Sequence, residues 1–404
     1  MNRGRVFVTG YGVITAIGNN AGENYQSLIN EKSGFGRLDF LNTVHRDEIP
    51  AFEIKLSDSD LCKMCGVPTD AGYTRTALLA LIAVREAIAS AFLSGAEVRE
   101  TGMISATTAG GIRELETWFD DLQDHEKTGD FLAYLDTSDA GDHTERLADF
   151  FQIRRYIGTL STACSSAANA IILGARLISH GVLERIICGG ADALSKVTLN
   201  GFNSLMILDR SLCRPFDENR NGLNLGEGAA YLVIESEEAL KRSGRKAICE
   251  LRGYANVNDI FHQTASSPDG SGAAACMEKA LAEAGLKKAD IDYINAHGTG
   301  TENNDLAEGM AIQTLFGVSP PPFSSTKPYT GHITAAAGSV EAAFCMMAFQ
   351  HDVIFPNLNF SMPMKELSIR PITEIKQNAR LRNILSNSYG FGGSGASLLF
   401  SKCP

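Results

Sequence analysis

The chain has 404 residues, of which 44% are hydrophobic and 21% are charged. This is typical of a globular protein with roughly two to three domains. The net charge of −11 argues against non-specific nucleic-acid binding. No apolar run reaches the roughly 18 residues of a membrane-spanning helix, and nine scattered cysteines without a secretory leader predict a reducing, cytoplasmic location.

Short β-branched segments alternate with helical patterns along the first half of the chain. Residues 5–9 (RVFVT) end at a glycine, which predicts a buried strand. Residues 77–91 repeat with helical period and contain neither glycine nor proline, so we expect a helix there. Residues 185–188 and 229–234 predict two further strands. This alternation predicts an α/β fold.

The second half repeats the order of a strand, a glycine-rich turn and a long helix. We expect strands at residues 247–251, 292–295, 384–387 and 396–401, and helices at 272–283 and 339–350. The polar stretch at 235–245 separates the halves, so we place the N-terminal half at residues 1–240 and the C-terminal half at residues 241–404. By itself this similarity is only weak evidence of a duplication.

The segment from Ser161 to Ala170 is the most informative one in the chain. Small residues surround Cys164, and residues 167–178 predict a helix, which places the thiol at or near a helix N-terminus. Unpaired N–H groups and the helix dipole favour a thiolate there, and small neighbours leave room for a substrate carbonyl group. The alternative interpretation is a buried structural cysteine.

The other cysteines lack this setting. Cys62 and Cys65 form a C-x-x-C pair, but no second pair or histidine follows at the spacing of metal ligands. We therefore expect both on the surface of a helix, and we predict no metal site. Cys188 lies in a predicted buried strand and Cys345 in a predicted apolar helix, where thiols are usually structural.

Two histidines lie in unusual surroundings. His297 follows a predicted strand in the turn NAHGTGT, and His332 comes five residues after Lys327 and directly before a helix of small residues. A loop histidine is more often a satisfied polar group than a catalyst. Together with Cys164, however, the pair fits carbon–carbon bond formation from thioesters. The thiol would hold an acyl chain, imidazole N–H groups an enolate oxygen, and backbone N–H groups a tetrahedral oxygen, without a metal or cofactor.

These segments resemble the type II elongating β-ketoacyl-[acyl-carrier-protein] synthases of the thiolase superfamily. The resemblance covers nearly the whole chain and implies a five-layered αβαβα thiolase-like fold of two duplicated halves, with the site between them. The motifs that carry it, in order, are Val8-Thr9-Gly10-Tyr11-Gly12, Thr162-Ala163-Cys164-Ser165-Ser166, Cys213-Arg214-Pro215-Phe216-Asp217, Gly226-Glu227-Gly228, His297-Gly298-Thr299-Gly300-Thr301, Lys327, Gly331-His332 and Asn387-Ser388-Tyr389-Gly390-Phe391-Gly392-Gly393.

The resemblance also implies roles for individual residues. Cys164 would take the acyl chain from the phosphopantetheine arm of an acyl carrier protein, and His297 and His332 would promote decarboxylation of a malonyl thioester. Lys327 would orient His332 and the network that adjoins it. The supporting residues implied are Glu308 in the lysine network, Asp305 as a brace of the neighbouring loop, Phe391 as oxyanion-hole N–H and gate, and Thr264, Thr299 and Thr301 as pantetheine ligands.

Departures from the family pattern bear on the substrate. Ala109 stands where a bulky aliphatic residue often gates the acyl pocket, which predicts a wider pocket. Gly395 and residues 221–225 also differ from the usual motifs. We therefore expect a decarboxylative Claisen condensation with malonyl-[acyl-carrier-protein], in fatty acid or in polyene or polyketide-type chain elongation. The resemblance implies a homodimer, or a heterodimer with a paralogue.

Other classes of protein fit less well. A thiolase needs a second cysteine in a C-terminal Cys-Gly-x-Gly motif, but residues 389–393 read YGFGG. An initiating synthase has asparagine where His332 stands. A non-catalytic partner subunit that sets chain length would lose the nucleophile, so Cys164 disfavours that alternative.

Overall fold

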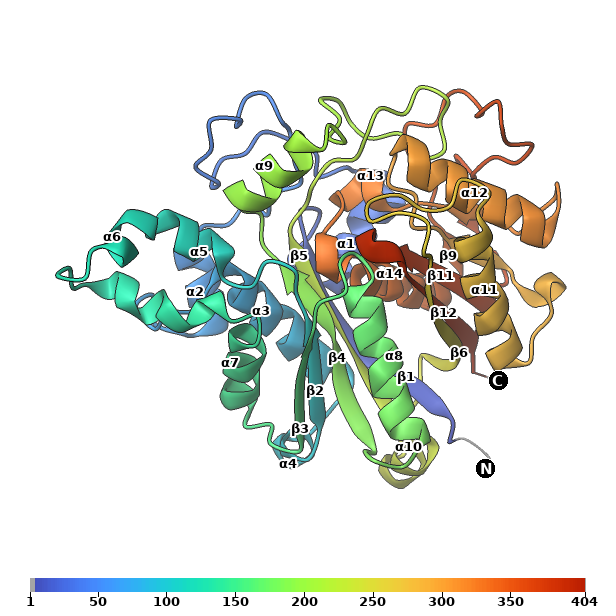
Figure 1. Cartoon of the computed structure of the whole chain (residues 1–404). Helices are drawn as coiled ribbons and strands as arrows, with labels where there is room; N and C mark the ends of the chain where they lie inside the picture. The colour runs from blue at the N-terminus through green and yellow to red at the C-terminus, as the bar shows by residue number, and fades with distance from the viewer. Residues whose placement is uncertain (1–3, 404) are drawn as a thin grey trace.

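The computed structural model describes residues 4–403 and is built around a mixed sheet of ten strands (Figure 1). The strands lie in the order β3-β2-β4-β5-β1-β6-β12-β11-β7-β8, and the short strands β9 and β10 form a separate pair. The bounds are Val6–Thr15 (β1), Gly102–Ala106 (β2), Tyr156–Leu160 (β3), Arg185–Asp192 (β4), Gly228–Ser236 (β5), Cys249–Asn258 (β6), Tyr293–Asn295 (β7), Phe323–Ser324 (β8), Val353–Ile354 (β9), Lys376–Gln377 (β10), Asn383–Tyr389 (β11) and Ser394–Lys402 (β12).

The two halves of the sheet are built alike. In the first half, β5 runs antiparallel to β1 and β4, while β2 runs parallel to β4 and β3. In the second half, β12 runs antiparallel to β6 and β11, while β7 runs parallel to β11 and β8. The halves join where β1 pairs with β6. The matching strand order and directions confirm the predicted fold of two related halves.

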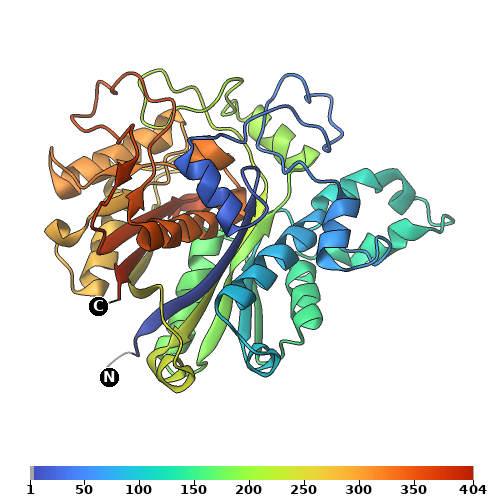
Figure 2. The ribbon, with the colours of Figure 1, turned by 180° about the vertical axis from the view of Figure 1, so that it is seen from behind.

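Helices cover both outer faces of the sheet and fill the space between its halves. α3 (Arg75–Ser90) and α7 (Asp142–Phe151) lie on the first half, and α11 (Ser271–Ala284) lies on the second with α12 (Glu302–Phe316) beside it. α8 (Ser166–Ser179) and α14 (Ala337–His351) contact each other and strands of the sheet, and form the middle layer (Figures 1 and 2). The result is the expected five-layered arrangement.

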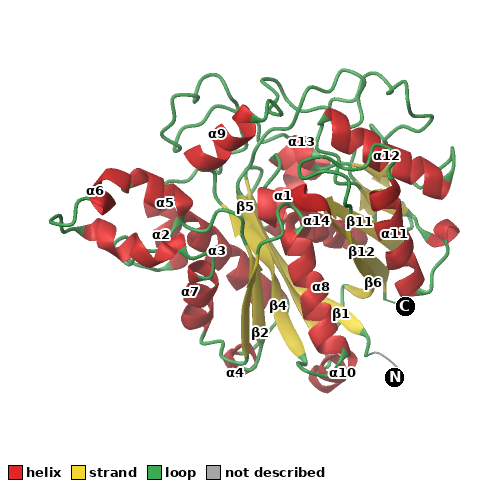
Figure 3. Cartoon of the chain, in the orientation of Figure 1, coloured by secondary structure: helices red, strands yellow, loops and turns green. Residues whose placement is uncertain are grey.

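Shorter helices connect these layers, and many of the long loops gather at one end of the sheet (Figure 3). The α-helices are α1 (Ala21–Ile29), α2 (Asp58–Cys65), α4 (Gly95–Arg99), α5 (Ile112–Thr117), α6 (Phe119–Gln123), α9 (Lys196–Ser204), α10 (Glu237–Ser243) and α13 (Lys327–Thr330). The 3-10 helices are η1 (Asp130–Ser138), η2 (Lys288–Asp290), η3 (Thr334–Ala336) and η4 (Phe391–Gly393).

The sequence explains which helices lie inside. α14 is buried without interruption from Ala337 to Phe349, as expected of a helix that lacks a polar stripe. α11 instead buries one face, through residues at helical spacing that include Cys276, Met277 and Ala280. The middle layer therefore shares a hydrophobic core with both halves of the sheet, and each outer helical layer has a core of its own.

Most expected elements are present, several of them longer than expected. The strand expected at residues 5–9 extends to Thr15 as β1, and the expected division after residue 240 falls inside α10. One expectation is wrong: Cys62 and Cys65 lie on a helix, α2, but both are buried because α2 packs against α3. Across residues 4–403, no helix is long and apolar enough to cross a membrane.

A segment of short helices projects from the body of the protein. α5, α6 and η1 lie together at the left of Figure 1, where Phe119, Leu132 and Leu135 are exposed. Among the described strands, β3 pairs with β2 alone, so it forms one edge of the sheet, and Ile157 on this strand is also exposed. Apolar side chains beside an open sheet edge are typical of an interaction surface.

Candidate active site

Cys164 lies in the turn between β3 and α8. Ala163, directly before it, has a φ of +52°, a left-handed conformation that residues with a side chain rarely adopt. Two hydrogen bonds hold the turn: Ser166 Oγ donates to the Ala163 carbonyl at 2.5 Å and accepts the Thr162 N–H at 2.7 Å. Gly390 approaches so closely that a Cβ there would lie 3.0 Å from the Cys164 nitrogen. The thiol is therefore fixed by its backbone surroundings.

His297 lies in the loop after β7, and two acids of α12 hold this loop from behind. Glu308 accepts the backbone N–H of His297 at 2.9 Å and that of the next residue at 2.8 Å. Asp305 accepts the N–H of Thr299 at 2.9 Å, as well as that of the residue after it. Both acids are buried, and burial raises the pKa of Glu308 to about 7. Asp305 therefore contacts the loop that we expected it to brace, and the role itself stays a prediction.

Lys327 contacts His297 directly, whereas the first contact that we expected was with His332. Its Nζ lies 3.1 Å from His297 Nδ1, donates to the His297 carbonyl at 2.5 Å and forms a buried ion pair with Glu341. Gly331, with a φ of +71°, turns the chain between Lys327 and His332. The two residues consequently reach the site from opposite ends of the short helix α13.

Glu341 is a site residue that the motifs did not reveal. It lies on α14, is 3% exposed, and burial raises its pKa to about 7, although Lys327 opposes that shift. A signal was available, since Glu341 is the single charged residue between positions 337 and 350. Glu308, which we expected in the lysine network, instead bonds to the His297 loop and to Asn387 Nδ2 at 3.2 Å.

His332 is held by its backbone. Its N–H donates to the Asn224 carbonyl at 2.8 Å, and its ring lies edge-to-face with that of His297, with centroids 5.2 Å apart. A Cβ on Gly331 would lie 2.9 Å from backbone atoms of Leu225, so this close approach requires glycine. His332 Nδ1 is buried without a hydrogen-bond partner among the described residues.

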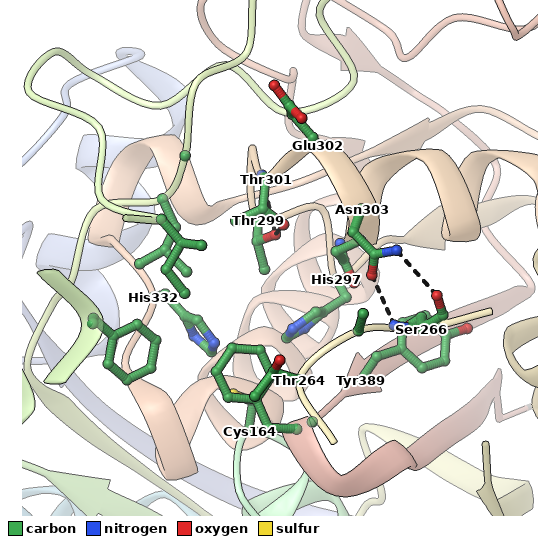
Figure 4. Close-up of a pocket in the computed structure, with 18 of the residues that line it drawn as sticks. Cys164, Thr264, Ser266, His297, Thr299, Thr301, Glu302, Asn303, His332 and Tyr389 are labelled. Carbon is green, nitrogen blue, oxygen red and sulfur yellow. Dashed lines mark hydrogen bonds between the residues drawn. The ribbon is translucent and has the colours of Figure 1, made fainter. Parts of the chain in front are cut away.

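One cavity of about 350 Å³ brings most of the expected residues together (Figure 4). Its wall includes Cys164 from the first half and both histidines from the second. In Figure 4 the two imidazole rings point toward one another. Lys327, Asp305 and Glu308 lie behind this wall, and Ala109 is not part of it. The other expected residues on the wall are Thr264, Thr299, Thr301 and Phe391.

Further residues on the wall were not expected from sequence. Phe202 of α9 stacks on Phe391, with ring centroids 6.0 Å apart and an interplanar angle of 19°. Tyr389 packs edge-to-face against His297 at 6.0 Å. Asn303 binds both the N–H and the carbonyl of Ser266, which ties one wall of the cavity to α12 (Figure 4). Such contacts join segments distant in sequence, so no local pattern reveals them.

The protonation state of Cys164 differs from the expectation. Burial raises the pKa of its thiol to about 11, while Lys327 and the N–H of Phe391 act in the opposite direction. The unacylated enzyme therefore holds a thiol near neutral pH, and the expected thiolate is wrong for this state. Burial and Lys327 lower the pKa of both His297 and His332 well below 6.5, so both imidazoles are neutral and each carries one N–H.

A buried cysteine facing two neutral histidines, in a five-layered fold of two related halves, defines a condensing enzyme of the thiolase superfamily. The chain belongs to the β-ketoacyl synthase family. Residues 3–239 match the family model "Beta-ketoacyl synthase, N-terminal domain", and residues 248–361 match "Beta-ketoacyl synthase, C-terminal domain". The class of reaction expected from the motifs is thereby confirmed.

Individual relatives support this assignment over the full length. The chain is 32% identical to 3-oxoacyl-[acyl-carrier-protein] synthase 2 of Synechocystis sp., covering 100% of this chain and 99% of the relative. It is 29% identical to the Staphylococcus aureus protein of the same name, covering 98% of both.

Solved structures agree with this. The ishigamide ketosynthase/chain length factor has a TM-score of 0.91 and 28% identity, covering 100% of both chains. A ketosynthase in complex with its chain length factor from Xenorhabdus doucetiae has a TM-score of 0.82 and 29% identity, covering 99% of this chain and 98% of that one. The thiolase-like fold is thus shared over the whole chain.

Proposed function

We propose that this enzyme condenses an acyl chain held on Cys164 with malonyl-[acyl-carrier-protein]. The observation that carries the proposal is the single cavity in which the Cys164 thiol of one half faces His297 and His332 of the other. The cavity wall also carries Thr264, Thr299 and Thr301, whose hydroxyl groups suit the amides of a pantetheine arm.

In the first half-reaction, Cys164 Sγ attacks the thioester carbonyl carbon of the acyl donor. The new S–C bond replaces the bond to the carrier sulfur, which leaves as a thiol with the proton from Cys164. The N–H groups of Cys164 and Phe391 both lie close enough to the sulfur to lower its pKa, so they suit an oxyanion formed on the same carbon. Phe391, stacked on Phe202, would move to admit the chain.

In the second half-reaction, the malonyl thioester loses carbon dioxide, and the electrons of the broken C–C bond form an enolate. Lys327 Nζ donates to His297 Nδ1, so the imidazole proton of His297 is on Nε2. N–H groups of His297 and His332 would hold the enolate oxygen. The enolate carbon then attacks the Cys164 thioester, which releases β-ketoacyl-carrier protein. The sulfur of Cys164 takes up one proton and the thiol is restored.

The structural neighbours indicate which partners this enzyme uses. One structural neighbour contains an acyl carrier protein with its ketosynthase, and others contain a chain length factor. We propose that this chain uses an acyl carrier protein and dimerises, with itself or with a paralogue, at the β3 edge beside Ile157. The exposed Phe119, Leu132 and Leu135 support this site. A cytoplasmic location stays a prediction from the cysteine pattern.

The presence of Cys164 with both histidines disfavours a non-catalytic chain-length subunit. The deciding experiment supplies malonyl-carrier and a mixture of primers, saturated and polyunsaturated, and identifies the carrier-bound products by mass spectrometry. We expect β-ketoacyl products from the wild type and a loss of roughly a thousandfold or more in the variant Cys164→Ala. Cys62→Ala, a buried cysteine outside the cavity, is the matched control. Products at undiminished rate from Cys164→Ala would refute the proposal.

A further inference from the structure

The mouth of the cavity is bordered by two segments without a charged side chain. Residues 197–208 read VTLNGFNSLMIL and residues 260–268 read IFHQTASSP, with no Asp, Glu, Lys or Arg in either. In the chain as a whole, 21% of residues are charged. We call these two segments the uncharged rim.

The uncharged rim also exposes large apolar side chains. Met206 is 88% exposed and Leu205 is 45% exposed, at the end of α9. In the second segment, Ile260 is 90% exposed and Phe261 is 56% exposed. Clustered exposed apolar groups at a functional opening are typical of a contact surface for another molecule.

Contacts place both segments at the same opening. Met206 and Phe202 of the first segment and Thr264 and Ser266 of the second line the cavity. Phe202 stacks on Phe391, and the Gln263 carbonyl accepts the N–H of the residue that follows Phe391 at 2.6 Å. The loop at η4 therefore joins the two segments of the rim around the entrance.

Charge at this opening is sparse. Glu302 is the single Asp, Glu, Lys or Arg residue on the wall of this cavity, and it lies at the end away from Cys164 in Figure 4. Arg220 donates to the backbone carbonyls of Thr301 and Glu302. Lys196 and Arg210 lie beyond the two ends of the first segment. The two segments of the uncharged rim themselves therefore offer no lysine or arginine to an acidic protein.

We propose that the acyl carrier protein docks on the uncharged rim through apolar contacts, with little contribution from ion pairs. This inference rests on the proposed function, because a substrate arm that reaches Cys164 through this opening brings the body of its carrier onto the rim. The partner that fits is a carrier whose surface around the attached arm presents apolar side chains. Burial of apolar surface, unlike attraction between exposed charges, is not weakened by moderate salt.

The test compares two substrates that differ only in the carrier. Malonyl and acyl groups are supplied either on the carrier protein or on free pantetheine, which needs no docking surface. For the double variant Leu205→Glu/Phe261→Glu, neither residue of which lines the cavity, we expect kcat/KM with carrier-bound substrates to fall about tenfold or more. With pantetheine thioesters, kcat/KM should change less than about twofold, which also shows that the variant is folded.

The control is Val318→Glu, at another exposed apolar position. It follows the far end of α12, a helix roughly 20 Å long at 1.5 Å per residue whose first residue, Glu302, lies on the cavity wall. This variant should behave as wild type with both substrates. In the wild type, KM for the carrier should change less than about threefold between 50 and 300 mM salt, on the order expected without exposed ion pairs.

Three outcomes would overturn the inference. One is equal loss with both substrates in the double variant, and another is no loss with the carrier. The third is a steep rise of KM with salt, which would assign docking to flanking cations such as Lys196 and Arg210. Failure of the proposed function is distinguishable, because the wild type would then condense neither carrier-bound nor pantetheine-bound substrates. Vesicle binding that is abolished in the double variant, with carrier kinetics intact, would assign the rim to a lipid surface instead.

Discussion

The two halves of the molecule hold their reactive groups by different means. In the first half, Cys164 is positioned by backbone geometry: a left-handed Ala163, a turn closed by Ser166, and the close approach of Gly390. In the second half, His297 is positioned by buried ionisable side chains, of which Glu308 accepts a hydrogen bond from its backbone. The first half thus supplies the nucleophile, and the second half supplies the histidines.

This difference explains the protonation states of the site. No ionised side chain of the first half is hydrogen-bonded to the thiol in the described structure, so burial dominates and raises the pKa of Cys164 to about 11. The main opposing influence is Lys327, which belongs to the second half. Burial, together with Lys327, also keeps the pKa of His297 low and its imidazole neutral. The ammonium group of Lys327 therefore lowers the pKa of a group in each half, Cys164 in the first and His297 in the second.

Removal of the histidines is the strongest test of this difference between the two halves. In His297→Ala and His332→Ala, acylation of Cys164 should persist, because the thiol is held by its own half. Decarboxylation of malonyl-carrier should fall about a hundredfold to a thousandfold, since the enolate oxygen loses a donor. Intact-protein mass spectrometry follows the acyl-enzyme, and release of labelled carbon dioxide follows decarboxylation.

His180→Ala serves as the control for these variants, since His180 is exposed at the end of α8. It should match the wild type in both half-reactions. Equal loss of acylation and decarboxylation in the two histidine variants would contradict the division of labour between the halves.

The sequence predicted the elements of this arrangement better than their contacts. Cys164 lies before α8 and His297 after β7, as their glycine- and small-residue motifs indicated. The motifs did not reveal that Lys327 contacts His297, because contact across a buried site depends on how Gly331 turns the chain. Glu341 was missed for the same reason. An acid in an apolar helix signals a buried partner, but nothing local says which one.

Burial of Cys62 and the high pKa of Cys164 show a second limit. C-x-x-C on a polar-looking helix predicts exposure, yet α2 turns this face toward α3. For Cys164, the helix N-terminus was correctly located, but desolvation, which depends on the complete fold, outweighs its effect on the thiol. Local patterns indicate where a group lies along an element, whereas burial decides its charge.

The ion pair between Lys327 and Glu341 allows its effect on stability to be separated from its effect on decarboxylation. In Glu341→Ala, the buried ammonium loses its carboxylate, and we expect the free energy of unfolding to fall by about 3–5 kcal/mol. The double variant Lys327→Met/Glu341→Leu removes both charges and should recover most of that loss. Urea unfolding measures the stability, and carbon dioxide release measures decarboxylation, which should remain impaired in the double variant.

A structural role alone predicts a different result for this pair. If the ion pair served only the fold, the double variant would regain decarboxylation together with stability. A stable variant that is still impaired would place the function of Lys327 in its contact with His297 Nδ1.

The smallest expected effect concerns the thiol itself. With a pKa of about 11, the thiolate fraction of Cys164 rises tenfold per pH unit, so iodoacetamide should label it roughly a hundredfold faster at pH 9 than at pH 7. Labelling is best followed in a Cys403→Ala background, because Cys403 is partly exposed. Lys327→Met should slow labelling further at each pH, since the charge that favours the thiolate is gone. A labelling rate that levels off near pH 7 would mean that the first half stabilises the thiolate by itself, through the helix N-terminus, and the contrast between the two halves would then disappear.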